Sequence, residues 1–447
     1  MRETLRLGGG AGFAGDRLDA PVHLAEHGKL DYLVLECLAE RTIALAQLRR
    51  RHDPATGYDS RLEQRIASLL PILVRRGIRL ISNFGAANPI AAADSIVAIA
   101  RRLDIPVKVA AVTGDDVLDL IDLDAPTMES GLPLSRYAPL VSANAYLGAE
   151  AILPALASGA DIVVTGRVAD PSLFVAPLMH EYGWAHDDVD RLARGTAVGH
   201  LLECAGQLCG GYFADPGCKE IPGMADLGFP FADVTPDGDA VLSKVAGTGG
   251  RITVATASEQ LLYEVTDPHG YLTPDVTADF SRVALTEAGP DRVAVRGARG
   301  RARPSQLKVS VGYLAGHVGE GEIGYAGTNA EARARLAGGI IRERLGNRFP
   351  DLRIEIIGST SLHGRALDSN TRPYEVRLRV AGRGRSRADA AIIGDEVEAL
   401  YTNGPAGGGG ARKYVNEQIG IVSTLVDRAR VESAVTLRQW SSHAKAV

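Results

Sequence analysis

Five hydrophobic segments in the first half of the chain each end in small, polar or glycine-rich residues. The five ends read Leu7-Gly8-Gly9-Gly10, Val34-Leu35-Glu36, Ile81-Ser82-Asn83, Val112-Thr113-Gly114-Asp115 and Val164-Thr165-Gly166-Arg167. Short apolar runs of this kind are typical of buried strands. The carboxyl ends of parallel strands meet at one edge of a sheet. The pattern therefore predicts a crevice surrounded by Asp16, Glu36, Asn83, Asp115 and Arg167.

Segments with helical spacing separate these strands. Apolar residues recur at Ile66, Leu69, Leu70 and Leu73, and Pro89 stands where a helix tolerates proline, in its first turn. We predict helices over 40–51, 61–76, from 89 onward and over 145–157, and strands over 30–36, 78–82, 107–112 and 161–164. This alternation predicts an α/β fold with a mainly parallel sheet flanked by helices, either open or closed into a barrel.

The pattern changes near Asp279. From there, short strands are joined by glycine and proline turns and are mixed with two helices. We predict strands over 283–285, 292–295, 307–311, 322–325, 353–357 and 375–380, and helices over 330–345 and 388–401. The sequence thus predicts an α/β domain over residues 1–279 and an α+β domain over residues 280–447.

Composition indicates a globular protein that does not bind nucleic acid. The 447 residues are 45% hydrophobic and 23% charged, which is enough for two cores. The net charge of −5 is spread along the chain, whereas a nucleic-acid surface needs a concentrated basic face. The arginines between Arg296 and Arg303 are interpreted as a solvated turn, with a phosphate site as the alternative.

The cysteines and the amino-terminal segment predict a cytoplasmic location. Cys37, Cys204, Cys209 and Cys218 lack a CxxC spacing, so a disulfide framework is not expected. No segment resembles a signal peptide, and no apolar run approaches the roughly 20 residues that span a bilayer. We expect no membrane partner.

Two glycine-rich loops are candidate substrate-binding elements. Gly9, Gly10 and Gly12 follow the first strand, where free backbone N–H groups would bind an anion; the alternative is a turn that needs positive φ. The loop does not match a dinucleotide fingerprint well.

The second loop, residues 403–411, contains Gly408 and Gly409 and is followed by Arg412. Four consecutive glycines indicate a loop that is mobile or closes over a ligand, and Arg412 would favour an anionic substrate. No Walker motif accompanies it, so ATP use is not expected.

Charged and amide side chains at the strand ends supply candidate chemistry. Arg167 would clamp a carboxylate, Asp170 or Asp16 would act as acid or base, and Asn83 would donate to a developing oxyanion. Structural ion pairs and helix caps are the alternative interpretation of the same residues. The further candidates for substrate binding are Arg17, Glu36, Asp115 and Asn144.

A third candidate group lies on one predicted helix face. Glu203 and Cys204 follow His200 by three and four residues, so their side chains share a face. This spacing would present an activated thiol or metal ligands, whereas a lone histidine among leucines is more often buried and hydrogen-bonded. We assign Glu203 and Cys204 as candidate catalytic residues and predict no metal.

Long stretches of the chain closely resemble the acyclic terpene utilization protein A (AtuA) family. The resemblance extends from about residue 5 to about residue 430 and is carried by GGGAGFAGDR, YLVLECLAERT, SNFGAANP, TGRVADPSLFVAPLMHEYGW, GHLLECAGQLCGGYFAD, LGFPFADV, EQLLYEVTDPHGYLTPDV and LYTNGPAGGGGARK. It implies a role in the breakdown of citronellol- and geraniol-type compounds, beside enzymes that process branched acyl-CoA thioesters.

From these observations we expect an enzyme of lyase or hydratase type that acts on a branched carboxylic acid or its CoA thioester. No cofactor is implied beyond CoA as part of the substrate, and a homo-oligomer is expected. The alternatives are a cysteine-dependent hydrolase or acyltransferase that uses Cys204, and a non-catalytic subunit of an acyl-CoA-processing complex.

Overall fold

The computed structural model describes residues 3–364 and 373–441. The chain divides into two compact units. Unit 1 comprises residues 1–136, 140–312 and 421–447, and unit 2 comprises residues 137–139 and 313–420. Unit 1 contains all the candidate residues at the strand ends.

The core of unit 1 is a ten-stranded open sheet, which confirms the α/β class. Its centre consists of five parallel strands in the order β1 (Leu5–Ala11), β2 (Tyr32–Leu35), β3 (Arg79–Ser82), β6 (Ile162–Thr165) and β4 (Val107–Thr113). These are the five strands that the hydrophobic pattern predicts. The strands β2 and β6 are buried along their whole length, as expected for strands covered on both faces.

Antiparallel strands extend the sheet on both sides, so the sheet is mixed rather than mainly parallel. Beyond β1 lie β7 (Pro230–Val234), β8 (Ala240–Lys244), β12 (Arg292–Arg296) and β11 (Ala284–Gly289), and β18 (Ala434–Trp440) pairs with β4 at the opposite edge. The boundary predicted at residue 280 does not coincide with the division into units, because the strands that follow it complete the first sheet.

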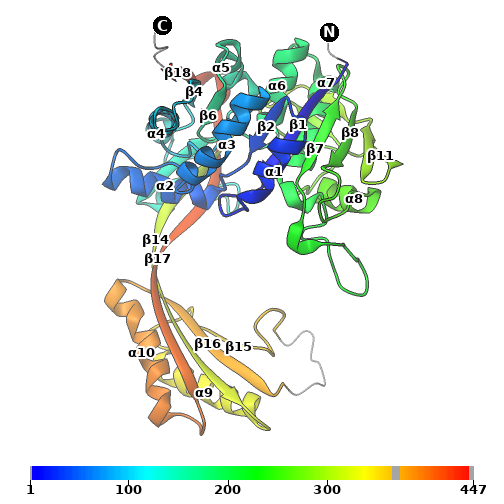
Figure 1. Cartoon of the computed structure of the whole chain (residues 1–447). Helices are drawn as coiled ribbons and strands as arrows, with labels where there is room; N and C mark the ends of the chain where they lie inside the picture. The colour runs from blue at the N-terminus through cyan, green and yellow to red at the C-terminus, as the bar shows by residue number, and fades with distance from the viewer. Residues whose placement is uncertain (1–2, 365–372, 442–447) are drawn as a thin grey trace. The chain divides into compact units, whose positions relative to one another are not determined.

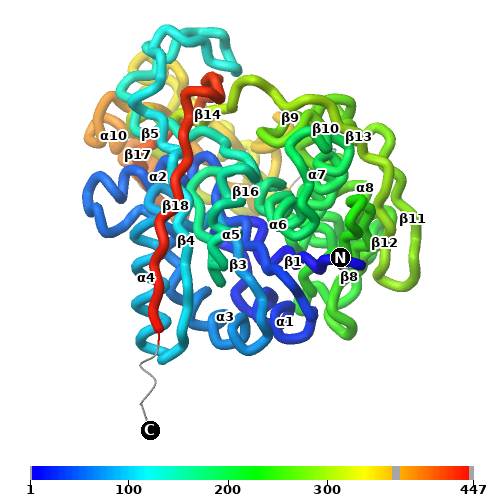
Figure 2. Tube along the Cα trace, turned by 90° about the horizontal axis from the view of Figure 1, so that it is seen from above, coloured from blue at the N-terminus to red at the C-terminus, as the bar shows by residue number. Residues whose placement is uncertain are grey.

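Helices cover both faces of this sheet (Figures 1 and 2). One face carries α1 (Asp19–His27), α3 (Leu62–Arg76) and α4 (Pro89–Leu103), whose leucines and isoleucines form one core with the strands. The other face carries α5 (Leu153–Ala157), α6 (Ser172–Tyr182) and α7 (Val189–Glu203). Three further elements of unit 1 are α2 (Glu40–His52), β5 (Leu140–Ala145) and α8 (Val254–Leu262).

The helix predicted over 145–157 is wrong in its first half. The segment 140–145 is strand β5, and a regular helix exists only over α5. Gly148 is extended between them, and the Asp275 carboxylate accepts the N–H of Ala149 at 2.8 Å. This long-range contact ends the strand in a way that local periodicity does not indicate.

Unit 2 is an α+β unit. Strand β16 (Glu375–Gly384) pairs antiparallel with β15 (Arg353–Ile357) and with β14 (Gln306–Ala326), and β17 (Gly409–Asp427) lies beside β14. The helices α9 (Ala330–Leu345) and α10 (Arg387–Asn403) pack with these strands around a separate core. The strands predicted over 307–311 and 322–325 are parts of the single strand β14.

Within the residues that the structure describes, every helix is too short or too polar to cross a lipid bilayer.

Glycines allow the end of α7 to lie directly on β1. A Cβ atom at Gly9 would lie 2.4 Å from the carbonyl oxygen of Leu202, and one at Gly12 would lie 2.8 Å from the carbonyl carbon of Cys204. Both distances are shorter than real side chains tolerate. The glycines therefore bring the last turn of α7, with Glu203, to the carboxyl end of the parallel strands.

We predict that Gly9→Ala destabilises the protein by about 1–3 kcal/mol, because the added methyl group forces β1 and α7 apart. Gly339→Ala is the control, since a Cβ at Gly339 meets nothing within 4 Å. Chemical denaturation of both variants checks this. An unfolding free energy of Gly9→Ala equal to that of Gly339→Ala would contradict it.

Candidate functional site

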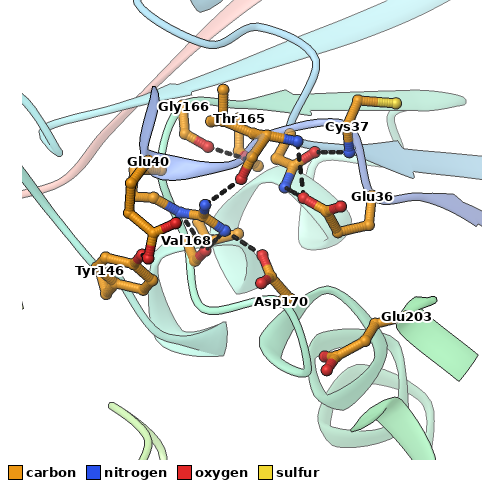
Figure 3. A network of polar contacts seen from close by, with 12 residues as sticks. Glu36, Cys37, Glu40, Tyr146, Thr165, Gly166, Val168, Asp170 and Glu203 are labelled. Carbon is orange, nitrogen blue, oxygen red and sulfur yellow. Dashed lines mark hydrogen bonds and ion pairs between the residues drawn. The ribbon is translucent and has the colours of Figure 1, made fainter. Parts of the chain in front are cut away.

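Two side chains that follow neighbouring strands are hydrogen-bonded to each other. Glu36 follows β2 and Asn83 follows β3; Asn83 Nδ2 donates to Glu36 Oε1 at 2.9 Å, and the backbone N–H of Leu38 donates to the same oxygen at 2.7 Å. Asn83 Oδ1 accepts the N–H of Cys37 at 2.7 Å (Figure 3). Both side chains are buried. Asn83 thus positions Glu36 with one of its two amide N–H groups, and its expected donation to a developing oxyanion stays a prediction.

Arg167, which follows β6, is fully buried and bound by the protein's own groups. Its Nε donates to the carbonyl oxygen of Val168 at 2.8 Å, and its terminal nitrogens donate to the carbonyls of Leu38 and Val168 and to the carboxylate of Asp170. The Tyr146 ring lies 4.6 Å from the guanidinium carbon. These contacts use Nε and both terminal nitrogens, so they favour a structural role for Arg167, and its role as a substrate clamp stays a prediction.

Tyr146 connects Arg167 to a second acid, Glu40, at the start of α2. The Tyr146 hydroxyl donates to Glu40 Oε1 at 2.6 Å (Figure 3). Lys308 Nζ lies 3.3 Å from the same oxygen. These contacts lower the pKa of Glu40 to about 2, although burial opposes them. Glu40 is thus an ionised partner of the buried cation.

Two further carboxyl groups near Arg167 bind protons more tightly than usual. Burial and the nearby Asp170 carboxylate raise the pKa of Glu36 to about 8, against the opposing influence of Arg167. Burial also raises the pKa of Asp170, whose side chain is nevertheless 33% exposed. The cluster therefore holds one acid, Glu36, that is mostly protonated at neutral pH, and it reaches the surface at Asp170.

Glu203 belongs to the same electrostatic cluster. Its Oε1 lies 2.8 Å from Nδ1 of His200, which confirms that these two residues share a helix face. Burial raises the pKa of Glu203 to about 7; His200 lowers it, and the carboxylates of Asp170 and Glu264 raise it. Figure 3 shows the Glu203 and Asp170 side chains on the same side of the cluster.

The Cys204 thiol is held in its protonated form. Burial and the neighbouring Glu203 carboxylate raise its pKa well above the ordinary value. Since the thiolate is the nucleophile, this environment disfavours covalent catalysis by Cys204.

Asp115 and Asn144 form a separate structural contact behind Arg167. Asp115 Oδ2 accepts the backbone N–H of Arg167 and the Asn144 amide, each at 2.9 Å. A Cβ atom at Gly166 would lie 2.3 Å from the Asp115 carboxylate, so the glycine makes this approach feasible. Asp115 thus fixes the backbone from which the Arg167 side chain extends.

In the loop after β1, where an anion was expected, the Asp16 side chain of the chain itself accepts the free N–H groups. The Asp16 carboxylate accepts the N–H groups of Gly12 and Arg17 at 2.9 and 2.7 Å, and it therefore closes its own loop. Two arginines donate to backbone carbonyl oxygens of this loop. Arg65 donates to the carbonyl oxygen of Ala14, and Arg61 donates to that of Asp16. Gly9, Gly10 and Gly12 serve close packing rather than ligand binding, because a Cβ at Gly10 would meet Leu33 and Leu35.

Arg17 lies outside the carboxyl cluster as well. It pairs with Asp19, donates to the carbonyl of Leu227 at 2.9 Å, and lines a groove of about 720 Å³ beside α1 and α3. The five strand ends thus bring Glu36, Asn83, Asp115 and Arg167 together, whereas Asp16 binds its own loop and Arg17 lines a different hollow.

The second glycine-rich loop joins α10 to β17 in unit 2. Gly407 has a φ of +74°, and a Cβ atom at Gly408 would lie 2.9 Å from Ile323. Gly409 is the first residue of β17, and the side chain of Arg412 is exposed on that strand. Arg333 donates to the carbonyl of Ala406 at 2.7 Å. These contacts fix the loop within unit 2.

Several residues of the cluster were not predicted from the sequence. Glu40, Tyr146, Lys308, Gln260, Glu264 and Tyr271 come from distant parts of the chain and match no spacing rule. Three of them stand in the segment EQLLYEVTDPHGYLTPDV, whose density of polar and aromatic residues was the available signal. In the described part of the chain, no group of three or more His, Cys, Asp or Glu residues could hold a metal ion.

Comparison with known proteins gives one match. The model of the family described as acyclic terpene utilisation family protein AtuA matches residues 5–437. Neither the curated proteins nor the solved structures contain a significant match.

We predict that Arg167→Met destabilises the protein by about 3–5 kcal/mol, because it leaves the Asp170 carboxylate and two carbonyl groups without their cation. Thermal and chemical unfolding measure this effect. A folded variant of unchanged stability that only binds substrate more weakly would show instead that Arg167 is a substrate clamp.

Proposed function

Since the chain belongs to the acyclic terpene utilisation family AtuA, we propose that it is a cytoplasmic enzyme of branched acyl metabolism that works by acid–base chemistry of lyase or hydratase type. The observation that carries the proposal is the pair Glu36 and Glu203. Their pKa values of about 8 and 7 lie near neutral pH, where a carboxyl group exchanges protons most effectively.

Glu36 is the proposed hydrogen-bond donor to the substrate carbonyl. At neutral pH it is mostly protonated, and a neutral carboxylic acid in a buried site can donate to a developing enolate oxygen. Asn83 and the N–H of Leu38 both bind Oε1, so the proton resides on Oε2. Arg167 is a positioning residue that acts on the orientation and proton affinity of these acids.

Glu203 is the proposed base. Its Oε2 has no hydrogen-bond partner among the described residues and is buried, so it is available to take the proton next to the carbonyl group. The electron pair of the broken C–H bond moves to the carbonyl oxygen, where Glu36 donates. Expulsion of a β-hydroxyl as water then needs one proton, which the protonated Glu203 returns to the leaving oxygen, so that the carboxylate is restored. The reverse sequence is hydration.

The charges of the cluster favour a neutral thioester over a free carboxylate. The Asp170 carboxylate raises the pKa values of both Glu36 and Glu203, Glu264 also raises that of Glu203, and the nearby cation is already bound by carbonyls and Asp170. A carboxylate at the reacting end would add negative charge without a free cation to receive it. A CoA thioester presents a neutral carbonyl.

The two alternative functions are a cysteine-dependent enzyme and a non-catalytic subunit, and the structure weighs only against the first. The raised pKa of Cys204 weighs against a cysteine-dependent hydrolase or acyltransferase. A non-catalytic subunit would retain the cluster but catalyse no proton exchange, and the experiment below separates it from an enzyme. A homo-oligomer remains part of the proposal.

We predict that the protein exchanges the α-protons of citronellyl-CoA, which lie on a saturated carbon next to the thioester carbonyl, with solvent deuterium, and that Glu203→Gln slows this exchange by about 10²–10⁴-fold. Nuclear magnetic resonance of the thioester in deuterated buffer measures the rate. Glu181→Gln is the control, because Glu181 binds Tyr32 at the opposite end of β2.

Exchange that is absent in the wild type would contradict the proposal and favour the non-catalytic subunit. Exchange that survives in Glu203→Gln but is lost after thiol alkylation would favour Cys204. The free acids should exchange far more slowly than the thioesters.

A further inference from the structure

His200 is a buried titratable residue for which the proposed reaction has so far no role. It lies one turn before Glu203 on α7 and is 1% exposed. Its Nδ1 lies 2.8 Å from Glu203 Oε1. Because this buried imidazole contacts the carboxyl group of the proposed base, it can affect both the orientation and the proton affinity of that group.

Aromatic rings separate the imidazole from water. The ring of Tyr271, on β9 (Tyr271–Leu272), lies 5.3 Å from the His200 ring, and the ring of Phe280 lies 5.8 Å from it. The two aromatic rings stack on each other at 5.0 Å. The imidazole therefore exchanges protons through its polar neighbours rather than through bulk water.

Three groups favour the protonated, positively charged form of the His200 imidazole. They are the Glu203 carboxylate on its own helix, the backbone of Leu261 at the end of α8, and the Glu264 carboxylate beyond it. Together they raise the pKa of His200, although burial opposes them. Gln260 donates to the backbone carbonyl of His200 at 3.1 Å and fixes this turn of α7 against α8.

We propose that His200 is the positioning residue of Glu203, and that it directs one carboxylate oxygen to the substrate and keeps the buried carboxyl group ionised. Nδ1–H binds Oε1, which leaves Oε2, buried and without a partner among the described residues, as the oxygen that takes the proton. The imidazolium charge offsets the cost of an ionised carboxylate in this place. The role at the substrate rests on the proposed function, whereas the electrostatic coupling between the two side chains does not.

The test is a titration of Glu203 with and without the imidazole. In His200→Asn the amide nitrogen replaces Nδ1 as donor but carries no charge. The carboxyl stretching band of Glu203 is identified by its loss in Glu203→Gln and is followed by infrared spectroscopy against pH. We expect its midpoint near pH 7 in the wild type and at least about one pH unit higher in His200→Asn, a tenfold change in proton affinity.

His186→Asn is the matched control, because His186 is exposed; it should leave the midpoint unchanged. A folded His200→Asn protein with an unchanged Glu203 midpoint would overturn the proposal. If His200→Asn does not fold, the converse measurement decides: the imidazole of His200 should titrate at lower pH in Glu203→Gln, and an unchanged titration would refute the coupling. Neither measurement depends on turnover, so the result is independent of whether the thioester reaction is found.

Discussion

The burial of one guanidinium at the carboxyl ends of the parallel strands organises this site. A buried cation must be matched by acceptors, since its removal from water is costly. Arg167 meets this requirement with the carbonyls of Leu38 and Val168 and with Asp170. Leu38 follows β2 and Val168 follows β6, so these bonds connect the ends of two strands separated by β3. The same cation limits how far burial raises the pKa values of Glu36 and Asp170.

The second constraint is the close approach of α7 to β1. Because positions 9 and 12 are glycines, no side chain blocks this approach. Glu203, at the end of α7, thereby reaches the carboxyl cluster. One acid, Glu36, is held by amide donors after β2 and β3, and the other, Glu203, by an imidazole on its own helix. Different surroundings thus give two carboxyl groups that titrate near neutral pH, the condition that general acid–base catalysis requires.

The hydrophobic pattern predicts the five parallel strands and the meeting of Glu36, Asn83 and Arg167, because strand periodicity and parallel topology are local and general properties. It does not predict what these side chains bind. Arg167 donates to carbonyls that no motif encodes, and Asp16 closes its own loop. The predicted boundary at residue 280 does not coincide with the division into units for the same reason: β12 and β18 pair antiparallel with the distant strands β8 and β4, and β11 joins the sheet through its neighbour β12. Tyr146, Glu264 and Tyr271 likewise depend on contacts between remote segments.

The fold keeps the carboxyl group of Glu36 protonated near neutral pH, and the pH dependence of the stability of Glu36→Gln measures this effect. The pKa of Glu36 is about 8 in the folded protein, above its ordinary value, so the folded state binds more protons and the wild type loses stability as pH rises through this range. Glutamine cannot ionise. The unfolding free energy of Glu36→Gln relative to wild type should therefore increase by about 1 kcal/mol per pH unit between about pH 5 and 8. A difference that stays constant over this range would show that Glu36 is ionised at ordinary pH, and would contradict the account.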